Sequence, residues 1–533
     1  MSAINYTYYV TIGALETQVY PSGDWSLKVT KAEEDFPFCK DYRIKFDGDF
    51  IFSGDDYNLL RDTAGCCDKI DLRIQCNGLD YWFGYFSYPY DFEVDEDRCQ
   101  ISGTPKPFDK YYYFDLHADD KEDQYADKTF TYQNDFPDAP AAAQWYDGCV
   151  NCRLLWDFIY DLGTGLPVWP FLSIINAKST FFNNDAFPDL TDPYPDGPGA
   201  INYVTGFAQK LNYVVMAMAN NVCDTGIASE WPAWSWNDIM EIVHNTFNTW
   251  WYIDEQGDVR VEHIYFWELY FPVSYDLTTI DGGRWIKNTS KYDYRKEEIP
   301  AEEWWLFSEM MDTFENSSFK YYGCYLPGKT RYIKEYSLSN LTTDLEYIAP
   351  GTLNLLTSPD CADVSASDYM FIRCIPAADV PVTYPALPIC GPDYVAWFSR
   401  YLGDGNDHLN AHLSPLNLII NYWMHDRPLW TGYILLLIEH VIFESTWKNL
   451  RQTELCFPVC CDNEVEILDV GAAADPRYLY QFGIDFNEFI TTQYGGGELY
   501  TGTIKDGMLC LQLIYEDSDC EESATEWSSA SEL

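Results

Sequence analysis

Two histidines at helical spacing are the first residues in this chain whose arrangement could support chemistry. His408 and His412, in "DHLNAHL", would share one face of a helix and could bind a metal ion together. Metalloproteases with this spacing carry a glutamate directly after the first histidine as the general base, and Leu409 stands there instead. The pattern of that enzyme class is therefore absent. Two interpretations stay open: a metal site that includes Asp404, and a loop that follows the turn "GDGND".

Cysteine spacing is a second potential source of metal chemistry. The chain has 17 cysteines, with close groups at Cys149 and Cys152 ("CVNC") and at Cys456, Cys460 and Cys461 ("CFPVCC"). A zinc ribbon needs two such pairs at a fixed spacing, and these groups lie far apart in the sequence. The first residues, "MSAINYTYYVTIGALETQVY", lack the basic and apolar regions of a signal peptide. We therefore expect most of the cysteines to be free thiols with a structural role.

Carboxylates are too numerous for sequence proximity to select a catalytic pair. The chain has 84 acidic residues, whereas a glycosidase needs only two that face each other across a cleft. The sequence contains no phosphate-binding loop, no nucleophile elbow and no dinucleotide-binding fingerprint. The acidic stretches "DEQGD" and "VDEDRC" do not match the spacing of a calcium-binding EF-hand loop. We predict no catalytic, cofactor-binding or metal-binding residues, and a protein that is not an enzyme.

The charge balance argues against a nucleic-acid-binding or membrane-binding surface. Acidic residues outnumber the 33 basic ones so far that the formal net charge is −51. Binding to phosphates or to an anionic membrane needs clustered Lys and Arg, and the sequence has no basic run. The longest apolar run, residues 429–443, is interrupted by Glu439 and His440, so it predicts a buried element and no membrane insertion. The charge fits simple solubility, or a surface past which DNA slides without adhering.

Alternating apolar and polar residues predict a mainly β fold. Segments 42–60 and 69–88 each contain two such runs around an Asp-Gly or Asn-Gly dipeptide, which is a hairpin signal. The region 455–515 has similar runs and ends in two strands joined at another Asp-Gly dipeptide. These patterns predict a β-rich multidomain protein, with β-barrel-like or sandwich modules and a few short helices.

Composition shifts along the chain predict its domains. The regions are an N-terminal β-rich domain (1–115), an acidic, loop-rich insertion (116–200), a mixed α/β middle domain (201–410), a C-terminal β-rich domain (411–515) and an acidic tail (516–533). The tail has the composition of a loosely ordered segment. Within the middle domain, the capping-box spacing of Ser235 and Asp238 predicts the start of a helix.

A helix followed by an aromatic hairpin, residues 235–267, is the most distinctive local pattern. The runs "TWWYI" and "VRVEHI" predict two strands around a turn at Gly257. Trp250 and Trp251 are adjacent, so their side chains point to opposite faces of a strand. At most one of them can join any one sugar-binding surface. We interpret the hairpin as architecture, with core packing and one aromatic residue at an interface.

Three blocks of sequence together resemble a group of large virion-associated proteins. The blocks are "FCKDYRIKFDGDFIFSGDDYNLL" with "YWFGYFSYPYDFEVDEDRCQI", then "FNTWWYIDEQGDVRVEHIYFW", and finally "HDRPLWTGYILLLIEHVIFESTWKNLRQTELCFPVCCDNEVEIL" with "ITTQYGGGELYTGTIKDGMLCLQLIY". The series is similar to proteins of tailed phages that infect Bacteroidetes. No block contains a catalytic motif, and the acidic, aromatic-rich regions 116–200 and 290–400 depart from the pattern.

The resemblance implies a structural component of the virion tail, with hub-like or baseplate-like β-barrel domains around a central channel. The implied partners are further copies of the chain, in a closed ring or trimer, and other tail proteins, while genomic DNA passes without specific binding. The protein would be made in the cytoplasm of the host bacterium and end in the virion. Aromatic residues make up 17% of the chain and suit large interfaces. Two alternatives stay open: a glycan-binding tail adhesin and a virion-associated glycan-degrading enzyme.

Overall fold

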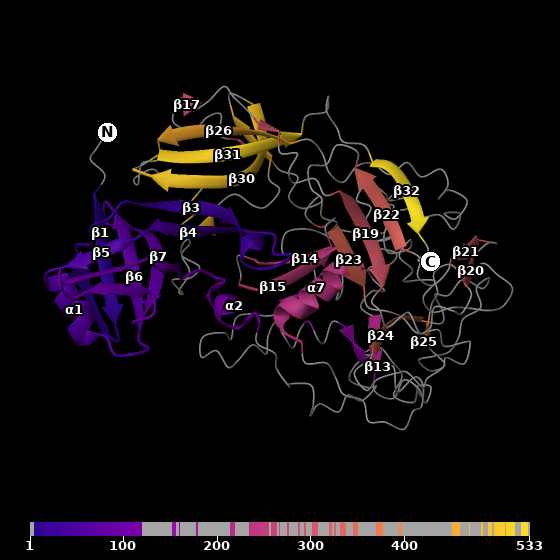
Figure 1. Cartoon of the computed structure of the whole chain (residues 1–533), viewed down its shortest axis with the longest axis horizontal. Helices are drawn as coiled ribbons and strands as arrows, with labels where there is room; N and C mark the ends of the chain where they lie inside the picture. Colours follow the sequence, from indigo (N-terminus) through magenta and orange to yellow (C-terminus); the bar gives the residue numbers. More distant parts are fainter. Residues whose placement is uncertain are drawn as a thin grey trace.

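The computed structural model shows a chain built mainly of antiparallel sheets (Figure 1). It describes residues 5–119, 152–155, 159, 177–179, 214–218, 234–254, 257–263, 266, 274–276, 286–287, 293–294, 301–307, 319–321, 324–326, 331–336, 345–349, 369–376, 394–396, 450–458, 468–469, 481–482, 489–492, 495–506, 508–516 and 524–530. Strands dominate these residues, and three α-helices accompany them. The predicted mainly β fold class is therefore confirmed.

The N-terminal region contains two antiparallel sheets. The larger has the strand order β10 (Lys106–Pro107), β7 (Leu79–Ser87), β6 (Lys69–Cys76), β1 (Tyr6–Ile12) and β2 (Leu15–Val19). The smaller contains β5 (Phe50–Ser53), β9 (Gln100–Gly103) and β8 (Phe92–Asp95). The hairpin predicted in 69–88 is confirmed, because Asn77 and Gly78 turn the chain between β6 and β7 with φ of 52° and 87°. Apolar residues of β6 alternate with polar ones and are buried.

The hairpin predicted in 42–60 is wrong, although both of its strands exist. β4 (Tyr42–Gly48) pairs with β3 (Trp25–Lys31) in a further sheet, described below, whereas β5 pairs with β9 in the smaller N-terminal sheet. The turn dipeptide therefore marks a corner at which the chain passes between sheets. Gly48 has a φ of 116°, and a Cβ there would lie 2.4 Å from the backbone oxygen of Asp24. The polar stretch that follows begins helix α1 (Asp55–Thr63).

Strands from the two ends of the chain form one nine-stranded sheet. Its members, besides β3 and β4, are β16 (Ser274–Asp276), β17 (Ile286–Lys287), β18 (Asp293–Tyr294), β26 (Leu450–Pro458), β29 (Phe489–Thr492), β30 (Gly495–Lys505) and β31 (Met508–Glu516). β3 pairs antiparallel with β30, so that Leu27 faces Ile504 and Val29 faces Gly502. Figure 1 shows the yellow C-terminal strands beside the indigo β3 and β4.

The main hydrophobic core is built by both ends of the chain. Its members from the N-terminal strands include Val10, Leu27, Val29, Phe50, Phe52, Ile70, Leu72, Ile74, Trp82 and Phe86, and those from the C-terminal strands include Leu455, Ile490, Leu499, Ile504, Leu509, Leu511 and Leu513. Most of these side chains are almost fully buried, and each contributes roughly 1.5–3 kcal/mol by leaving water. The N-terminal strands are therefore stabilised by residues that follow them in the sequence by more than 400 positions.

The cysteines depart in part from the prediction of free thiols. Cys456 of β26 and Cys510 of β31 face each other in register and form a disulfide. Cys76 is also disulfide-bonded. Cys39, Cys66, Cys67 and Cys99 are free thiols. The sequence could not reveal the bridge, because the pairing of β26 with β31 brings together residues that are 54 positions apart.

The helix and hairpin predicted in 235–267 are confirmed. Helix α7 (Trp236–Phe247) begins with a capping box, in which Ser235 Oγ accepts from the Asp238 N–H and the Asp238 side chain accepts from the Ser235 N–H. Strands β14 (Thr249–Ile253) and β15 (Val259–His263) follow, and β12 (Ala177–Lys178) extends their sheet. The turn between β14 and β15 includes Gly257, with a φ of 83°.

Two four-stranded sheets and two short strand pairs complete the described structure. One four-stranded sheet has the order β11 (Cys152–Leu154), β13 (Val214–Met218), β24 (Tyr369–Pro376) and β25 (Tyr394–Ala396), and the other has the order β23 (Leu345–Ala349), β19 (Glu302–Phe307), β22 (Arg331–Tyr336) and β32 (Ala524–Ala530). The first strand pair is β20 (Phe319–Tyr321) with β21 (Cys324–Leu326), and the second is β27 (Leu468–Asp469) with β28 (Gln481–Phe482). The expectation of a loosely ordered tail is wrong for β32, which pairs with β22. Within the described residues, no helix has the length and hydropathy needed to cross a membrane.

Candidate functional site: a charged joint beside a surface groove

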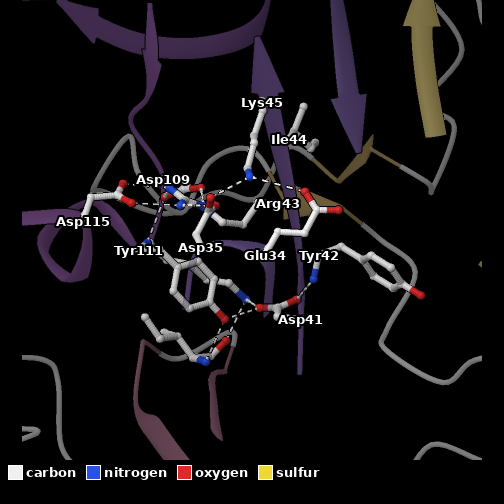
Figure 2. A network of polar contacts seen from close by, with 12 residues as sticks. Glu34, Asp35, Asp41, Tyr42, Arg43, Ile44, Lys45, Asp109, Tyr111 and Asp115 are labelled. Carbon is white, nitrogen blue, oxygen red and sulfur yellow. Dashed lines mark hydrogen bonds and ion pairs between the residues drawn. The ribbon is translucent and has the colours of Figure 1, made fainter. Parts of the chain in front are cut away.

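Arg43, on β4, lies at the centre of a buried ion cluster (Figure 2). Only 2% of its side chain is exposed, and its guanidinium donates to Asp109 through Nε at 2.9 Å and to Asp115 through Nη2 at 2.8 Å. Nη1 reaches Asp35 at 2.8 Å. Asp35 follows the short 3-10 helix η1 (Ala32–Glu34), whereas the other two carboxylates come from the segment that forms helix α2 (Tyr112–His117). The cluster therefore joins three separate parts of the chain.

Burial and charge oppose each other in this cluster. Burial would lower the pKa of the Arg43 guanidinium, but Asp109 and Asp115 raise it well above its usual value. Burial raises the pKa of the Asp115 carboxyl, and the positive charge of Arg43 offsets only part of that effect. Lys45 adds a second cation, 2.7 Å from Asp35. Cations thus engage all three carboxylates, which suits a structural ion cluster better than a site with a free general base.

A second set of polar contacts links the cluster to the hairpin. The Tyr111 hydroxyl donates to Asp41 at 2.6 Å and accepts from the backbone N–H of Ile253 in β14 at 3.2 Å. Lys110 bridges the same two elements, with its Nζ 2.6 Å from the Asp41 carboxylate and 2.7 Å from the Ile253 carbonyl oxygen. Burial raises the pKa of Tyr111 well above its usual value, so the hydroxyl stays protonated and can donate.

Trp251 packs where the hairpin meets the N-terminal region. We call this contact region, which also includes Asp41, Tyr111 and Ile253, the joint. Its side chain is fully buried, and its indole N–H donates to the carbonyl oxygen of Pro37 at 3.0 Å. Its ring packs against four other rings, whose centroids lie 4.9–5.9 Å away: Phe36, Tyr111, Phe114 and Trp236. These residues come from the loop after η1, from the α2 segment and from α7. Trp251 is therefore a core residue of the joint, and its face of the hairpin is not a sugar-binding platform.

The opposite face of the hairpin is also enclosed. Arg260 and Glu262 of β15 are fully buried and lie 3.2 Å apart, and Arg260 also contacts Asp254 at 3.0 Å. His244, on α7, stacks on Phe38 with ring centroids 3.9 Å apart. Its Nδ1 lies 3.1 Å from the carbonyl oxygen of Thr249. Burial lowers the pKa of His244 to about 3, so the imidazole is neutral at physiological pH.

A surface groove of about 820 Å³ lies beside the Arg43 cluster. Its lining residues include the carboxylates Asp35, Asp49, Asp91, Glu93 and Asp115, the cations Arg43, Lys45 and Lys106, and the aromatic residues Phe46, Tyr85, Tyr90 and Phe92. Tyr90 is 73% exposed at this surface. Asp91 is held by Lys106 at 2.8 Å and by the Ser87 backbone N–H at 2.7 Å. The groove offers hydrogen-bonding groups and an exposed ring, while the contacts of Asp91 fix its position.

The residues singled out from the sequence fall into two groups. Trp250, Trp251 and Gly257 lie at the joint or its turn, where the architectural interpretation placed them. The candidate metal ligands Cys149, Cys460, Cys461, Asp404, His408 and His412 lie outside the described residues. Cys456 is in a disulfide and therefore does not provide a thiolate ligand. In the described part of the chain, no three His, Cys, Asp or Glu side chains are grouped to hold a metal ion.

Sequence reasoning missed the Arg43 cluster completely. Asp109 and Asp115 are 66 and 72 positions from Arg43, and nothing in their spacing distinguishes them from the other acidic residues. The local pattern even pointed the other way, because Arg43 alternates with the apolar Tyr42 and Ile44 and would be expected on the solvent-facing side of β4. A buried charge of this kind requires partners, but their identity depends on the tertiary fold.

Comparisons with known proteins give a likeness in structure and none in sequence. No protein-family model and no curated protein matches this sequence. Among solved structures, the chain is similar to the 43 kDa tail protein of prophage MuSo2 from Shewanella oneidensis, with 8% sequence identity and a TM-score of 0.35. The match covers 96% of this chain and 98% of that one.

Proposed function

We propose that this chain is a structural component of a phage tail, in a hub-like or baseplate-like position around the DNA channel. The observation that carries the proposal is the enclosure of Trp251. The aromatic hairpin is buried at Trp251 between the loop after η1, α2 and α7, and the nearby cations Lys110 and Arg260 are paired with carboxylates. A hairpin that binds or cleaves glycans would instead present these groups to solvent.

The blocks that resemble virion proteins supply several elements of the framework. The first block includes β4, β5 and α1, the second includes β14 and β15, and the third ends in β30 and β31. Of these, β4, β30 and β31 belong to the sheet shared by the two chain ends, and β14 and β15 form the hairpin at Trp251. A resemblance concentrated in framework residues supports a shared architecture and does not point to a shared catalytic site.

The charge supports a position beside passing DNA. With a formal net charge of −51 for each copy, an assembled ring would repel a duplex at any point where its acidic residues face the channel. Screening limits this repulsion to about 8–10 Å at physiological salt, which is still enough for a channel slightly wider than DNA. The copies would associate through aromatic-rich surfaces, and closed rings follow when a heterologous interface has a suitable rotation.

Light scattering coupled to gel filtration tests the assembly half of the proposal. The chain has a mass of 61.7 kDa, and a ring or trimer gives an integer multiple of that value with a narrow distribution. A mass of one chain across the accessible concentration range contradicts self-assembly. Adding linear duplex DNA at moderate salt should leave the elution position unchanged. A salt-sensitive complex with DNA contradicts the channel proposal.

A glycan-binding function is the second candidate, and the exposure of Tyr90 beside the groove favours it. An exposed ring can stack on a sugar face, and carboxylates can accept hydrogen bonds from its hydroxyl groups. Screening the full chain and the Tyr90→Ala variant against bacterial surface glycans tests this function. Binding that the wild type shows and the variant loses establishes an adhesin role. If both proteins bind nothing in the panel, the structural role stands alone.

A further inference from the structure

The turn between α1 and β6 presents two adjacent thiols. Cys66 and Cys67 are the central residues of a four-residue turn, which the Asp68 backbone N–H closes by donating to the Gly65 carbonyl oxygen at 3.1 Å. The Asp68 side chain also accepts from the Gly65 N–H at 2.6 Å. Both thiols are exposed, and their Sγ atoms lie 3.6 Å apart. Two sulfur atoms of a formed disulfide are about 2.05 Å apart, so closure needs an approach of roughly 1.5 Å.

A neighbouring turn holds the dithiol in place. The Cys67 backbone N–H donates to the Tyr88 carbonyl oxygen at 2.9 Å, and the Tyr88 N–H donates to the Asp68 carbonyl oxygen at 2.9 Å. The Cys67 Sγ lies 3.7 Å from the hydroxyl of Tyr90. Cys67 has a φ of 72°, an uncommon value for a residue with a side chain. The backbone contacts on both sides therefore keep the two thiols together at the surface.

We propose that Cys66 and Cys67 form a redox-active vicinal dithiol, which small-molecule disulfides convert reversibly to a vicinal disulfide. One cysteine attacks the small disulfide as a thiolate, forms a mixed disulfide and releases one small thiolate. The neighbouring cysteine then loses its proton and attacks the protein sulfur of that mixed disulfide, which releases the second small thiolate. Two protein thiols are oxidised and one small disulfide is reduced to two thiols, so atoms and electrons balance.

The arrangement of the two cysteines favours the second step. The attacking sulfur is already next to its target, so ring closure competes effectively with attack by a free thiol from solution. The ring that forms is small and exposed, and strained or exposed disulfides are the readily reduced ones. Hydrogen bonding with Cys67 raises the pKa of Cys66, so the reaction should accelerate as the pH rises above neutrality.

Two other cysteines serve as internal controls. Cys99 is an exposed free thiol whose Sγ contacts the Glu96 carbonyl oxygen, with no second thiol bonded to it. Cys39 is fully buried, and burial raises its pKa well above the usual value. Cys99 is exposed without a partner thiol and should therefore form a mixed disulfide, whereas the buried Cys39 should not react.

Peptide mapping of the full chain tests the proposal. The folded protein is incubated with glutathione disulfide, the remaining thiols are blocked with N-ethylmaleimide, and cleavage before aspartate releases peptides 62–67, 97–108 and 35–40. We expect peptide 62–67 to lose two hydrogens and carry no adduct. Peptide 97–108 should carry glutathione, and peptide 35–40 should be unmodified by glutathione. Adducts of glutathione or N-ethylmaleimide on both Cys66 and Cys67 would overturn the proposal.

A single substitution and a trivalent arsenical provide the second test. In the Cys66→Ser variant, peptide 62–67 should carry one glutathione and should no longer lose two hydrogens. Phenylarsine oxide should protect both thiols of the wild type from N-ethylmaleimide, because arsenic binds two sulfurs with release of one water. Cys99 and the variant should lack this protection. Equal labelling of the wild type and the variant in the presence of the arsenical would contradict a functional dithiol.

Discussion

Trp251 donates its backbone N–H to the carbonyl oxygen of Phe38 at 3.0 Å, and its own carbonyl oxygen accepts from the Lys40 N–H at 2.8 Å. The loop at 36–40 therefore pairs with β14 as a short parallel bridge centred on Cys39 and Trp251. This backbone pairing, together with the indole contact to Pro37, fixes the hairpin to the N-terminal sheets. The joint should therefore behave as one cooperative unit with those sheets.

Trp251→Ala should destabilise the fold by about 3–5 kcal/mol, because it removes a fully buried ring from the centre of five packed aromatic side chains. Denaturant unfolding, followed by circular dichroism, measures the change. Trp250→Ala is the matched control, since Trp250 is the adjacent residue, is only half-buried and lies under the Lys40 ammonium group at 4.6 Å. Equal costs for the two substitutions would contradict the enclosure of Trp251.

Arg43→Met should destabilise the protein by about 2–4 kcal/mol at neutral pH, because it leaves three neighbouring carboxylates without their shared cation. The cost is set below that of a fully buried pair, since Asp109 and Asp115 keep 20% and 25% of their side-chain exposure. The cost should shrink in acid, where the carboxylates are protonated. Arg61→Met is the control, because Arg61 is exposed, with an ion pair to Asp62 and a contact with the Tyr57 ring. A cost that does not change with pH would show that Arg43 acts by packing alone.

His244 should make stability depend on pH. Its pKa falls from 6.5 to about 3 on folding, so the folded state binds fewer protons than the unfolded state between these values. The stabilisation is complete above pH 6.5 and is lost as the pH falls toward 3, by up to about 1.4 kcal/mol per pH unit. His244→Phe keeps a ring against Phe38 and removes the titration. The stability difference between wild type and variant should therefore shift against the wild type in acid. A constant difference from pH 7 to pH 4 would refute the neutral buried imidazole.

Gly48→Ala should be more destabilising than Gly13→Ala. Both glycines have positive φ, so each alanine is strained by roughly 1–2 kcal/mol. At Gly48 the new methyl would also meet the Asp24 carbonyl oxygen, at the corner where the chain passes from β4 in the nine-stranded sheet to β5 in the three-stranded sheet. At Gly13 it would meet nothing within 4 Å. Thermal unfolding of the two variants measures the difference, and similar midpoints would show that the corner tolerates a side chain.

Local signals account for the parts of this fold that the sequence could predict. The capping box at Ser235, the turn at Asn77 and the alternation in β6 all depend on neighbours a few residues apart. The pairing of β4 with β3, in place of the expected pairing with β5, depends on partners outside the local sequence, and so does the pairing of β3 with β30.

The candidate site was accessible from the sequence only on its hairpin side. The adjacency of Trp250 and Trp251 indicated that one of them is buried, and the structure shows which one. The ion cluster around Arg43 was not predictable, because 84 acidic residues offer too many potential partners for one arginine. The same limit applies to the bridge between Cys456 and Cys510 in a chain with 17 cysteines.

Labelling this chain on purified phage particles tests the central claim most directly. Particles are collected from the culture whose genome encodes the chain, treated with a gold-conjugated antibody against it and imaged by electron microscopy. The proposal of a structural tail protein predicts gold at the tail in most particles, at a fixed distance from the head. Particles without label, or label spread over the head, would contradict it.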